Sequence, residues 1–424
     1  MNEKVFAEVY GCSANQSDYE MALGIIKKNG FRIVNDANNS DLNIIFTCIV
    51  KTPTSDRMIH RLRELTKLNK PLIVAGCMPK TERKIIEGIS PRASMIGPNA
   101  IHTIDKIIKK TLNGEKIELT KDLKTPKLCL PRIRKNPIIE ICEISTGCLN
   151  ACSFCEVKLA KGNLKSYPLN DIIKEIKGSL KEGCREIWLT SQDCGCWGMD
   201  KKSNLANLVN EICKINGRFL VRIGMMNPSH AKKIINDLLA CYKSEKVFKF
   251  IHLPVQSGSD KILKNMNRNY VIKDFESVVQ KFVNEFPMLN LSTDIIVGFP
   301  GETSKDFQKT IDLIKRIEPD IVNISKFGAR PGTKAEKMKQ ISRKIINERC
   351  KKLTKIVRTI QLKKNNKWIG FEGEVLIDEV NDKKIVGRNF AYRPVILNKG
   401  KLGDFKIVKI KSASTTSLFG EILD

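Results

Sequence analysis

Short apolar runs alternate with amphipathic helical stretches through the first hundred residues. The runs NIIFTC at 43–48 and PLIVAGC at 71–77 are almost uninterrupted, as expected for strands buried on both faces. The stretch 17–30 has helical spacing and stops at Gly30, a residue that commonly ends helices. This alternation predicts a doubly wound parallel sheet with helices on both sides. Its strands are expected at 5–12, 31–34, 43–48, 71–77 and 95–97.

A second series of strand and helix signals begins at Ile138. Stretches such as 170–183 and 303–317 have helical periodicity and separate the apolar runs. Six β/α units are too few for a complete eight-unit barrel, so we expect a partial, open (β/α)6 barrel that could admit a bulky substrate. Its strands are expected at 138–145, 185–191, 219–226, 247–255, 289–299 and 320–327.

The remaining segments divide the chain into domains. Residues 118–137 contain three prolines and have neither strand nor helix periodicity, which predicts a linker. From about residue 366, short strands separated by Gly, Asn and Asp turns predict a small β-barrel, a fold that often binds oligonucleotides. The expected domains are an N-terminal sheet domain at 1–117, a linker at 118–137, a barrel domain with a basic C-terminal helix at 138–364, and a β-barrel at 365–424.

The charge of the chain indicates a polyanionic partner. The formal net charge is +28 over 424 residues, and residues 330–364 hold 13 basic and 2 acidic side chains. Nucleic acid is the commonest such partner, although a solvated helix face is the alternative for 330–364. No apolar run approaches the roughly 18 residues of a membrane span, and the N-terminus lacks a signal sequence. We therefore expect a cytoplasmic protein with no membrane partner.

Cysteine usage is high, with 14 residues. Cytosolic thiols stay reduced, so regularly spaced cysteines indicate metal or cluster ligation rather than disulfides. The segment TGCLNACSFC places Cys148, Cys152 and Cys155 on one loop after a strand. Three thiolates on one loop can hold a 4Fe-4S cluster and leave its fourth iron open for a chelating ligand. A structural zinc site is the alternative, but no nearby fourth Cys or His completes it.

Three further cysteines follow three separate strands of the N-terminal sheet. Cys12, Cys48 and Cys77 each end an apolar run, and the carboxyl ends of parallel strands share one edge of a sheet. We infer a second three-cysteine cluster there, also with an open iron. The alternative is three buried core cysteines.

The loop at 148–155 resembles that of radical S-adenosylmethionine (SAM) enzymes. With the N-terminal trio and the β-rich tail also considered, the chain resembles the methylthiotransferases over nearly its whole length. Within that family it most resembles the branch that acts on threonylcarbamoyladenosine in tRNA. The tail resembles the RNA-binding TRAM domain. The similarity is carried by YGCSANQSD, FTCIVKTPTSDR, AGCMPK, LTSQDCGCWGMD, HLPVQSGSDKILKNMNRNY, TDIIVGFPGET and SKFGARPGTKAEKM.

The resemblance implies a transferase that adds a methylthio group to carbon 2 of the modified adenosine beside the anticodon. It implies two 4Fe-4S clusters, SAM as radical source and methyl donor, and an electron donor such as a flavodoxin or ferredoxin. The base must leave its stack to reach a recessed site. The alternatives are an enzyme acting on isopentenyladenosine in tRNA or on a ribosomal-protein aspartate, or a non-catalytic iron–sulfur RNA-binding protein.

Contacts to SAM are expected at the carboxyl ends of the partial-barrel strands. Phe154, between two ligands, is expected beside the cofactor, and Asn15 and Asp18 either orient substrate or cap a helix. The other candidates, for which turn or ion-pair roles are the alternative, are Ser191, Gln192, Asp193, Arg222, Gln256 and Asp294.

Two departures from the family pattern stand out. Lys158, Lys161 and Lys165 occupy a stretch where the family often has arginines, so the charge is kept without the planar fork of Arg. Cys194 and Cys196 have a C-x-C spacing that resembles a metal motif, but we expect ordinary thiols in a loop.

Overall fold

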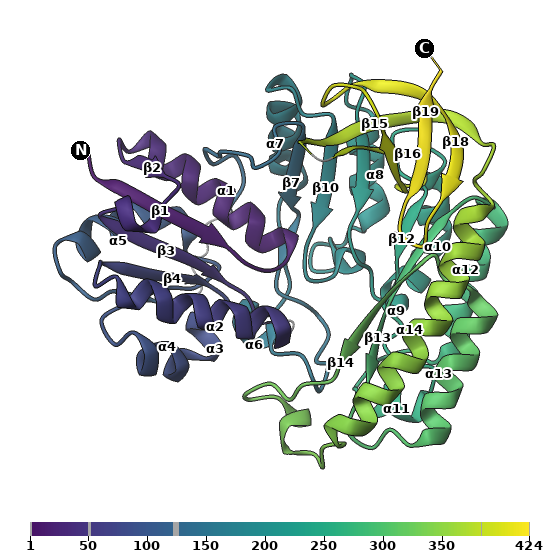
Figure 1. Cartoon of the computed structure of the whole chain (residues 1–424), viewed down its shortest axis with the longest axis horizontal. Coiled ribbons are helices and arrows are strands. Elements are labelled where there is room, and N and C mark those ends of the chain that lie inside the picture. The colour runs from purple at the N-terminus through teal and green to yellow at the C-terminus, as the bar shows by residue number, and fades with distance from the viewer. Residues whose placement is uncertain (1, 50–51, 122–126, 383, 424) are drawn as a thin grey trace.

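The chain folds into three parts that follow one another in sequence (Figure 1). The computed structural model describes residues 2–49, 52–121, 127–382 and 384–423. Residues 122–126 of the expected linker and residues 50–51 of the FTCIVKTPTSDR motif lie outside the described residues. The expected fold class is confirmed, because parallel α/β sheets are followed by a small closed β-barrel.

The N-terminal part is a parallel sheet in the order β2-β1-β3-β4-β5-β6. Its strands are β1 (Lys4–Val9), β2 (Arg32–Val34), β3 (Leu42–Thr47), β4 (Leu72–Gly76), β5 (Ser94–Ile96) and β6 (Glu118–Leu119). Its helices are α1 (Ser13–Lys28), α2 (Thr52–Lys67), α3 (Met78–Thr81), α4 (Arg83–Ile89) and α5 (Ile104–Leu112), with short 3-10 turns η1 (Ala37–Asn39) and η2 (Ile101–Thr103). β6 belongs to this sheet although sequence analysis places its residues in the linker.

Both faces of this sheet are covered, as a doubly wound fold requires. The apolar sides of α1 and α5, through Met21 and Ile108, pack on one face. Those of α2 and α4, through Leu62 and Ile86, pack on the other. The central strand β3 is buried along its whole length, which explains its uninterrupted apolar run.

The central part contains two groups of three parallel strands, in the orders β11-β10-β7 and β12-β13-β14. The strands are β7 (Ile139–Glu143), β10 (Glu186–Thr190), β11 (Leu220–Ile223), β12 (Phe250–His252), β13 (Asn290–Val297) and β14 (Ile321–Lys326). A parallel bridge from Val221 to Val247 links the groups. Within the described residues, β14 and β7 share no ladder, so the barrel is open.

Helices surround the outer face of the partial barrel, where side chains such as Leu189 and Val221 form the largest core. They are α7 (Leu169–Lys181), α8 (Leu205–Cys213), α9 (Pro228–Lys233), α10 (Ile235–Tyr242), α11 (Asp260–Asn265), α12 (Ile272–Glu285), α13 (Ser304–Ile317) and α14 (Arg343–Asn366). The short helix α6 (Val157–Lys161) packs instead on α3 of the N-terminal part. The smaller elements are β8 (Ser145–Thr146), β9 (Lys165–Ser166), η3 (Cys194–Cys196) and η4 (Lys334–Lys337).

The C-terminal part is a closed barrel in the order β15-β16-β17-β19-β18. Its strands are β15 (Glu372–Asn381), β16 (Lys384–Asn389), β17 (Pro394–Leu397), β18 (Phe405–Ala413) and β19 (Leu418–Ile422). Leu376 and Phe405 of this barrel pack against Ile139 and Leu220, which lie where β7 and β11 begin. The C-terminal barrel therefore covers the starting ends of these strands and leaves the opposite end of the partial barrel uncovered.

The open edge of the partial barrel lies against the N-terminal part. α1 runs beside β7 (Figure 1), and Ser17 Oγ donates a hydrogen bond to the carbonyl oxygen of Ile141 at 2.9 Å. At the first residue of α1, Ser13 Oγ and Thr190 Oγ1 are hydrogen-bonded at 2.7 Å. This contact brings the beginning of α1 to the carboxyl end of β10.

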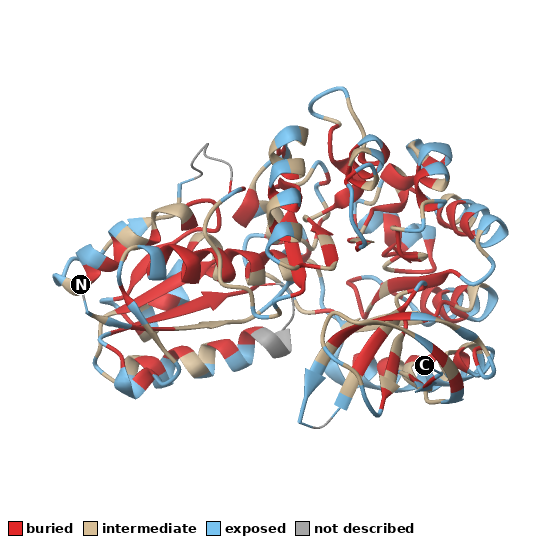
Figure 2. Cartoon of the chain, turned by 90° about the horizontal axis from the view of Figure 1, so that it is seen from above, coloured by how far each residue is buried: buried red, intermediate tan, exposed pale blue. Residues whose placement is uncertain are grey.

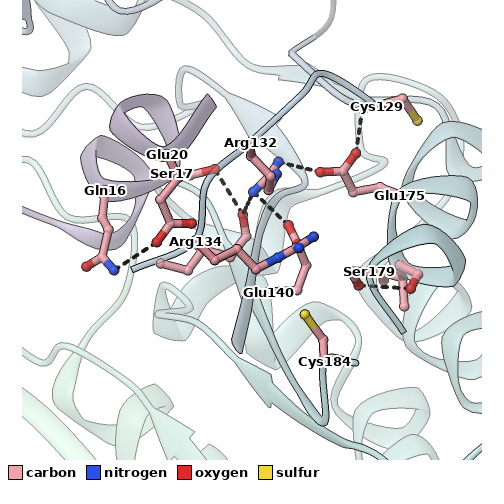
Figure 3. A network of polar contacts seen from close by, with 12 residues as sticks. Gln16, Ser17, Glu20, Cys129, Arg132, Arg134, Glu140, Glu175, Ser179 and Cys184 are labelled. Carbon is pink, nitrogen blue, oxygen red and sulfur yellow. Dashed lines mark hydrogen bonds and ion pairs between the residues drawn. The ribbon is translucent and has the colours of Figure 1, made fainter. Parts of the chain in front are cut away.

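Ion pairs fasten the segment between these parts (Figure 3). Arg132 pairs with Glu140 of β7 at 2.7 Å and with Glu175 of α7, and Arg134 also pairs with Glu140 at 2.6 Å. Glu20 of α1 accepts a hydrogen bond from the backbone of Lys135 at 3.1 Å. These contacts hold residues 132–135 of the expected linker against α1, β7 and α7.

Buried residues concentrate in the strands and on the inward faces of the helices (Figure 2). Among the described residues, no helix has the length and apolar character that crossing a bilayer requires.

Candidate functional site

The N-terminal cysteines lie at the carboxyl ends of three adjacent strands, β1, β3 and β4. Cys48 and Cys77 directly follow β3 and β4, whereas Cys12 is the N-cap of α1 rather than the end of a strand. The turn before it depends on Gly11, at φ +115°, where an added Cβ would stand 2.8 Å from Cys48 Sγ. Burial, opposed by Lys161 and reinforced by Cys12 and Cys48, raises the pKa of the Cys77 thiol. The fold thus brings this trio together.

The second trio lies on the loop between β8 and α6. Gly147, at φ +74°, opens this loop, and an added Cβ there would meet the carbonyl oxygen of Asn163 at 1.9 Å. The backbone N–H of Cys148 donates to the carbonyl of Gly162 at 3.2 Å, and that of Cys155 donates to Cys152 at 3.1 Å. The loop is therefore folded back on itself, with its three thiols on one short segment.

Each thiol of this loop receives its own hydrogen-bond donors. Cys148 Sγ accepts from the backbone N–H and the side-chain amide of Asn150 at 3.4 and 3.6 Å. Cys152 Sγ accepts from Arg268 Nη1 at 3.1 Å. Cys155 accepts from backbone N–H groups of α6. Donors converging on sulfur are the usual surroundings of metal-bound thiolates.

Burial works against free thiolates at this loop. It raises the pKa of Cys148 to about 11, with the carboxylate of Asp193 adding to the effect, and it also raises the pKa of Cys155. Bound iron would reverse this preference, because a metal ion stabilises the thiolate form. The thiols and their donors are therefore better matched to a metal group than to free cysteines.

The sulfur spacing distinguishes a cluster from a single ion. Ligand sulfurs on one zinc ion lie within about 4 Å of one another, given Zn–S bonds of about 2.3 Å. Among the described residues, neither cysteine trio has all its sulfurs within 4.8 Å of one another. This spacing is against a single zinc ion at either trio and is compatible with a multi-iron cluster, which spreads its thiolates over separate irons.

Another group does have its ligand atoms within 4.8 Å: Asp193, Cys196 and His230, all buried. Here the carboxylate of Asp193 is already used, accepting from His230 Nδ1 at 2.7 Å and from the Asn150 amide at 3.2 Å. Its other oxygen accepts from the backbones of Gly195 and Asn227, both at 3.0 Å. Asp193 therefore holds Asn150, and through it the donors to Cys148, in place.

The two trios are linked by the helices that follow them. α3 begins after Cys77 and packs on α6, which begins after Cys155. Ala160 of α6 belongs to the same apolar cluster as Cys77. Lys161 is 4 % exposed and pairs with Glu143 at 2.9 Å, and the carboxylates of Glu143 and Asp18 raise its pKa against the effect of burial. Both trios thus border the junction between the first two parts.

The expected SAM contacts on the second strand unit follow β10. Ser191 Oγ accepts from the backbone of Asp193 at 3.1 Å and donates to Cys194 Sγ at 3.5 Å. The side-chain oxygen of Gln192 is buried without a hydrogen-bond partner. An unsatisfied buried acceptor is costly, so Gln192 is suited to a bound molecule that carries a donor.

Asp294 and Gln256 lie together at the opposite strand group. The backbone N–H of Gln256, a residue at φ +69°, donates to the carbonyl of Asp294 at 2.8 Å. The carboxylate of Asp294 accepts from Asn323 at 2.8 Å and lies 3.1 Å from His252 Nε2. His252 and Asn323 are site candidates that sequence analysis missed. The sequence signal that could have identified them is their position in the expected strands 247–255 and 320–327, on either side of the strand that carries Asp294.

Arg222 and Phe154 have aromatic surroundings. The Arg222 guanidinium lies 5.2–5.3 Å from the ring centres of Trp188, Phe250 and Tyr392, the last from the C-terminal barrel. Its Nε is buried without an acceptor. Phe154 is half-buried and packs edge-on against Phe299 at 6.3 Å.

Asn15 and Asp18 have partners within the protein. Both lie inside α1, whose N-cap is Cys12, so the helix-cap interpretation is wrong for both. The Asn15 amide donates to the carbonyl of Thr47 at 3.0 Å, and Asp18 pairs with Lys127 at 2.5 Å. Cys194 and Cys196 are buried in η3 rather than in an open loop.

A basic groove runs along α14, starting beside the carboxyl end of β14. It is lined by Lys326, Lys351, Lys355 and Arg358, with Cys350 among them. Within the described residues, none of these four cations has a carboxylate within 4 Å. Unpaired cations in a groove are suited to phosphate groups.

Two family models match the chain. "Uncharacterized protein family UPF0004" matches residues 4–97, and "Radical SAM superfamily" matches residues 142–314. They cover the cysteine trio of the first sheet and that of the barrel loop, respectively.

The chain is similar over its full length to curated proteins. It is 41% identical to a "Probable threonylcarbamoyladenosine tRNA methylthiotransferase" of Pyrococcus horikoshii, covering 99% of both chains. It is 39% identical to a protein of the same name from Methanocaldococcus jannaschii, covering 100% of this chain and 98% of the relative. A human "Threonylcarbamoyladenosine tRNA methylthiotransferase" is 34% identical, over 96% of this chain and 72% of its own length.

Solved structures share the fold at low identity. The radical S-adenosylmethionine methyltransferase TsrM from Kitasatospora setae, with cobalamin and a [4Fe-4S] cluster bound, has a TM-score of 0.58 and 13% identity over 79% of this chain and 77% of its own. This likeness concerns the fold alone.

Proposed function

The chain belongs to the threonylcarbamoyladenosine tRNA methylthiotransferases, and we propose that it adds a methylthio group to carbon 2 of threonylcarbamoyladenosine beside the anticodon of tRNA. It is a radical SAM enzyme, a transferase that uses 4Fe-4S clusters and SAM. The observation that carries the proposal is the 41% identity over 99% of both chains to a relative of that name.

The two cysteine trios are the proposed ligands of two clusters. Cys148, Cys152 and Cys155 would hold the cluster that binds SAM, and Cys12, Cys48 and Cys77 would hold the other. The donors to Cys148 and Cys152 support the first assignment. The three adjacent strands β1, β3 and β4, whose carboxyl ends carry the other trio, support the second. When bound, the first cluster and SAM would supply a carbon-centred radical, a second SAM would supply the methyl group, and the second cluster would hold or relay the sulfur that is transferred.

The residues of the barrel mouth would position SAM and the base. Gln192 offers a buried acceptor without a partner, and Asp294 is oriented by His252 and Asn323. We assign cofactor contacts to both, and to Ser191, Gln256 and Phe154 beside them. Asp193 would not contact SAM itself; it would hold the Asn150 amide that donates to Cys148. Arg222, surrounded by three rings, links β11 to Tyr392 of the C-terminal barrel.

The tRNA would be held by phosphate contacts outside the mouth. The groove of α14 begins at Lys326, where β14 ends, so an RNA strand lying in it would reach the mouth. The C-terminal barrel would add a second contact surface. The base must leave its stack to enter the site. A low-potential donor such as a flavodoxin or ferredoxin would supply electrons, in the cytoplasm where the tRNA is found.

Nucleoside mass spectrometry of tRNA tests the substrate. In a strain that lacks this protein, the 2-methylthio form of threonylcarbamoyladenosine should disappear and the unmodified form should accumulate. The wild-type gene should restore the modification, and a Cys148→Ala gene should not. Loss of a methylthio group from isopentenyladenosine or from a ribosomal-protein aspartate would contradict the proposal, as would no change at all.

Iron and sulfide analysis tests the ligands. The anaerobically reconstituted full chain should hold about eight irons, and replacing either cysteine trio by alanine should leave about four. The control is a Cys129→Ala, Cys213→Ala chain, because neither thiol belongs to a trio and neither is fully buried. About four irons in the wild type would rule out the second cluster.

A further inference from the structure

Arg268 donates a hydrogen bond to one of the barrel-loop thiols from a distant part of the chain. Its Nη1 lies 3.1 Å from Cys152 Sγ, and the two residues are 116 positions apart. The guanidinium also lies over the ring of Tyr270, 5.1 Å from its centre, and its Nε donates to the Tyr270 hydroxyl at 3.3 Å. Arg268 is therefore the one cationic side chain seen to donate to a thiol of this trio within the described residues.

This guanidinium has no carboxylate partner. Among the described residues, no Asp or Glu oxygen lies within 4 Å of Arg268, which is half-buried. Two other half-buried arginines do have a carboxylate partner: Arg132 pairs with Glu140 at 2.7 Å, and Arg349 pairs with Glu302 at 2.6 Å. A buried cation without a counter-charge is expensive. The nearest group that can carry a negative charge is the Cys152 sulfur, 3.1 Å from Arg268 Nη1.

The loop that carries Arg268 is fixed to the cysteine loop on both sides of Cys152. The Asn267 amide donates to the carbonyl of Ala151 at 2.7 Å. Ser153 donates from its backbone to Met266 at 3.0 Å and from its hydroxyl to Asn265 at 2.8 Å. These three contacts place the guanidinium at Cys152 independently of its own hydrogen bond.

Tyr270 fixes the C-terminal end of the loop that carries Arg268. Its hydroxyl lies 2.9 and 3.1 Å from the carbonyl oxygens of Val255 and Pro254, which follow β12. The ring that supports the guanidinium is buried and cannot move freely. Arg268 is therefore presented to Cys152 in one orientation, with little entropy left to lose on forming the contact.

We propose that Arg268 is a positioning residue that supplies the counter-charge of the cluster held by Cys148, Cys152 and Cys155 and raises its reduction potential. The inference rests on the proposed function, which assigns a cluster to this trio. A one-electron reduction makes the cluster more negative, and a fixed cation hydrogen-bonded to a ligand sulfur stabilises the reduced form more than the oxidised form. The donors to Cys148 and Cys155 are neutral N–H groups, so this effect belongs to Arg268.

A redox titration followed by electron paramagnetic resonance tests this proposal. The full chain is reconstituted anaerobically with Cys12, Cys48 and Cys77 replaced by serine, so that the titrated signal comes from the barrel-loop cluster. In this background, Arg268→Gln should shift the midpoint potential to a more negative value while about four irons remain. Arg268→Lys keeps the charge and should return the midpoint toward that of the parent.

The control is Arg316→Gln, which removes the positive charge of an exposed arginine on α13 that pairs with Glu276 of α12, and it should leave the midpoint unchanged. An unchanged midpoint in Arg268→Gln with full iron content would overturn the proposal, since packing alone would then explain the residue. If Arg268→Gln loses its iron, retention of iron by Arg268→Lys supports the counter-charge, and loss in both variants with a folded chain overturns it. Absence of a cluster from the parent would instead refute the proposed function.

Discussion

Two glycines with positive φ control where the cysteines can stand. Gly11 and Gly147 each precede a cysteine of one trio, and an added Cβ would meet Cys48 or the backbone of Asn163. Neither position can accept a side chain without moving the turn, because L residues rarely adopt this conformation. The positions of the cysteine thiols therefore depend on the glycines that precede them as well as on the cysteines themselves.

Gly147→Ala should therefore disrupt the barrel-loop trio. The added methyl would stand 1.9 Å from the Asn163 carbonyl oxygen, so the turn before Cys148 must shift. We expect reconstituted Gly147→Ala to lose about half of its iron, measured by iron analysis. Gly178→Ala is the matched control, since Gly178 lies within α7 with open space around it and alanine there favours the helix. Full iron content in Gly147→Ala would show that the loop tolerates the shift.

Glu186 carries a pH dependence that can be tested. Burial, with the nearby carboxylate of Asp378, raises the pKa of Glu186 to about 7, although the indole of Trp188 donates to it. Because this pKa is raised on folding, the stabilisation it provides is complete below the unfolded pKa and is lost as pH rises through 7. Glu186→Gln, which stays neutral, should unfold at a higher urea concentration than the wild type at pH 8 but not at pH 5.

The exposed Glu372, which pairs with Lys409 at 2.6 Å, provides the control. Glu372→Gln should show no such gain at pH 8. If Glu186→Gln is instead destabilised at both pH values, the carboxylate is needed as a partner for the nearby arginines Arg222 and Arg388.

At the scale of elements, α14 combines a core face with a basic groove. Ile346, Leu353 and Val357 are buried against the partial barrel, which explains the helical spacing of apolar residues in this segment. Lys351, Lys355 and Arg358 line the groove. A helix that is anchored by one face holds its cations in fixed positions, as a phosphate-binding surface requires.

Replacing Lys351, Lys355 and Arg358 by glutamine should weaken tRNA binding. Because each phosphate contact releases counterions, the slope of log K against log salt should fall by about two for three lost contacts. Fluorescence anisotropy with a tRNA transcript over a series of salt concentrations measures this slope. Lys305→Gln, Lys309→Gln, Lys315→Gln on the exposed face of α13 removes the same charge and should leave the slope unchanged. Equal slopes for both triple variants would place the RNA elsewhere.

At the scale of the whole molecule, buried charges join the first two parts beside the cysteines. Lys127 pairs with Asp18 of α1 at 2.5 Å and with Glu143 of β7 at 2.6 Å, and Lys161 pairs with Glu143 at 2.9 Å. All four side chains are at most 3% exposed. Two cations and two anions balance one another, so the junction is specific but depends on every member.

Lys127→Met should destabilise the junction by about 3–5 kcal/mol, because it leaves two buried carboxylates with one cation. Urea denaturation of the full chain measures the loss. Adding Asp18→Asn removes the second charge of the pair and should recover most of it, as a double-mutant cycle would show. No recovery in the double variant would mean that Lys127 acts mainly through its contact with the Pro98 carbonyl.

The sequence by itself determined the strands, the helices and the cysteines that follow them. Apolar runs and helical spacing are local properties, so they predicted five strands of the N-terminal parallel sheet, the partial barrel and the C-terminal strands. The same locality placed Cys48 and Cys77 at strand ends. It failed for Cys12, where a turn at Gly11 lets α1 begin at once, and for β6, whose two residues pair only because β5 lies beside them.

Only the tertiary structure decided what surrounds these cysteines. Arg268 reaches Cys152 across 116 positions, and His230 holds Asp193 across 37. No periodicity encodes such pairs, because each depends on how separate β/α units close around one mouth. The docking of Tyr392 beside Arg222 has the same origin. Local patterns specify elements, whereas the surroundings of a site come from contacts between elements, which exist only once the chain has folded.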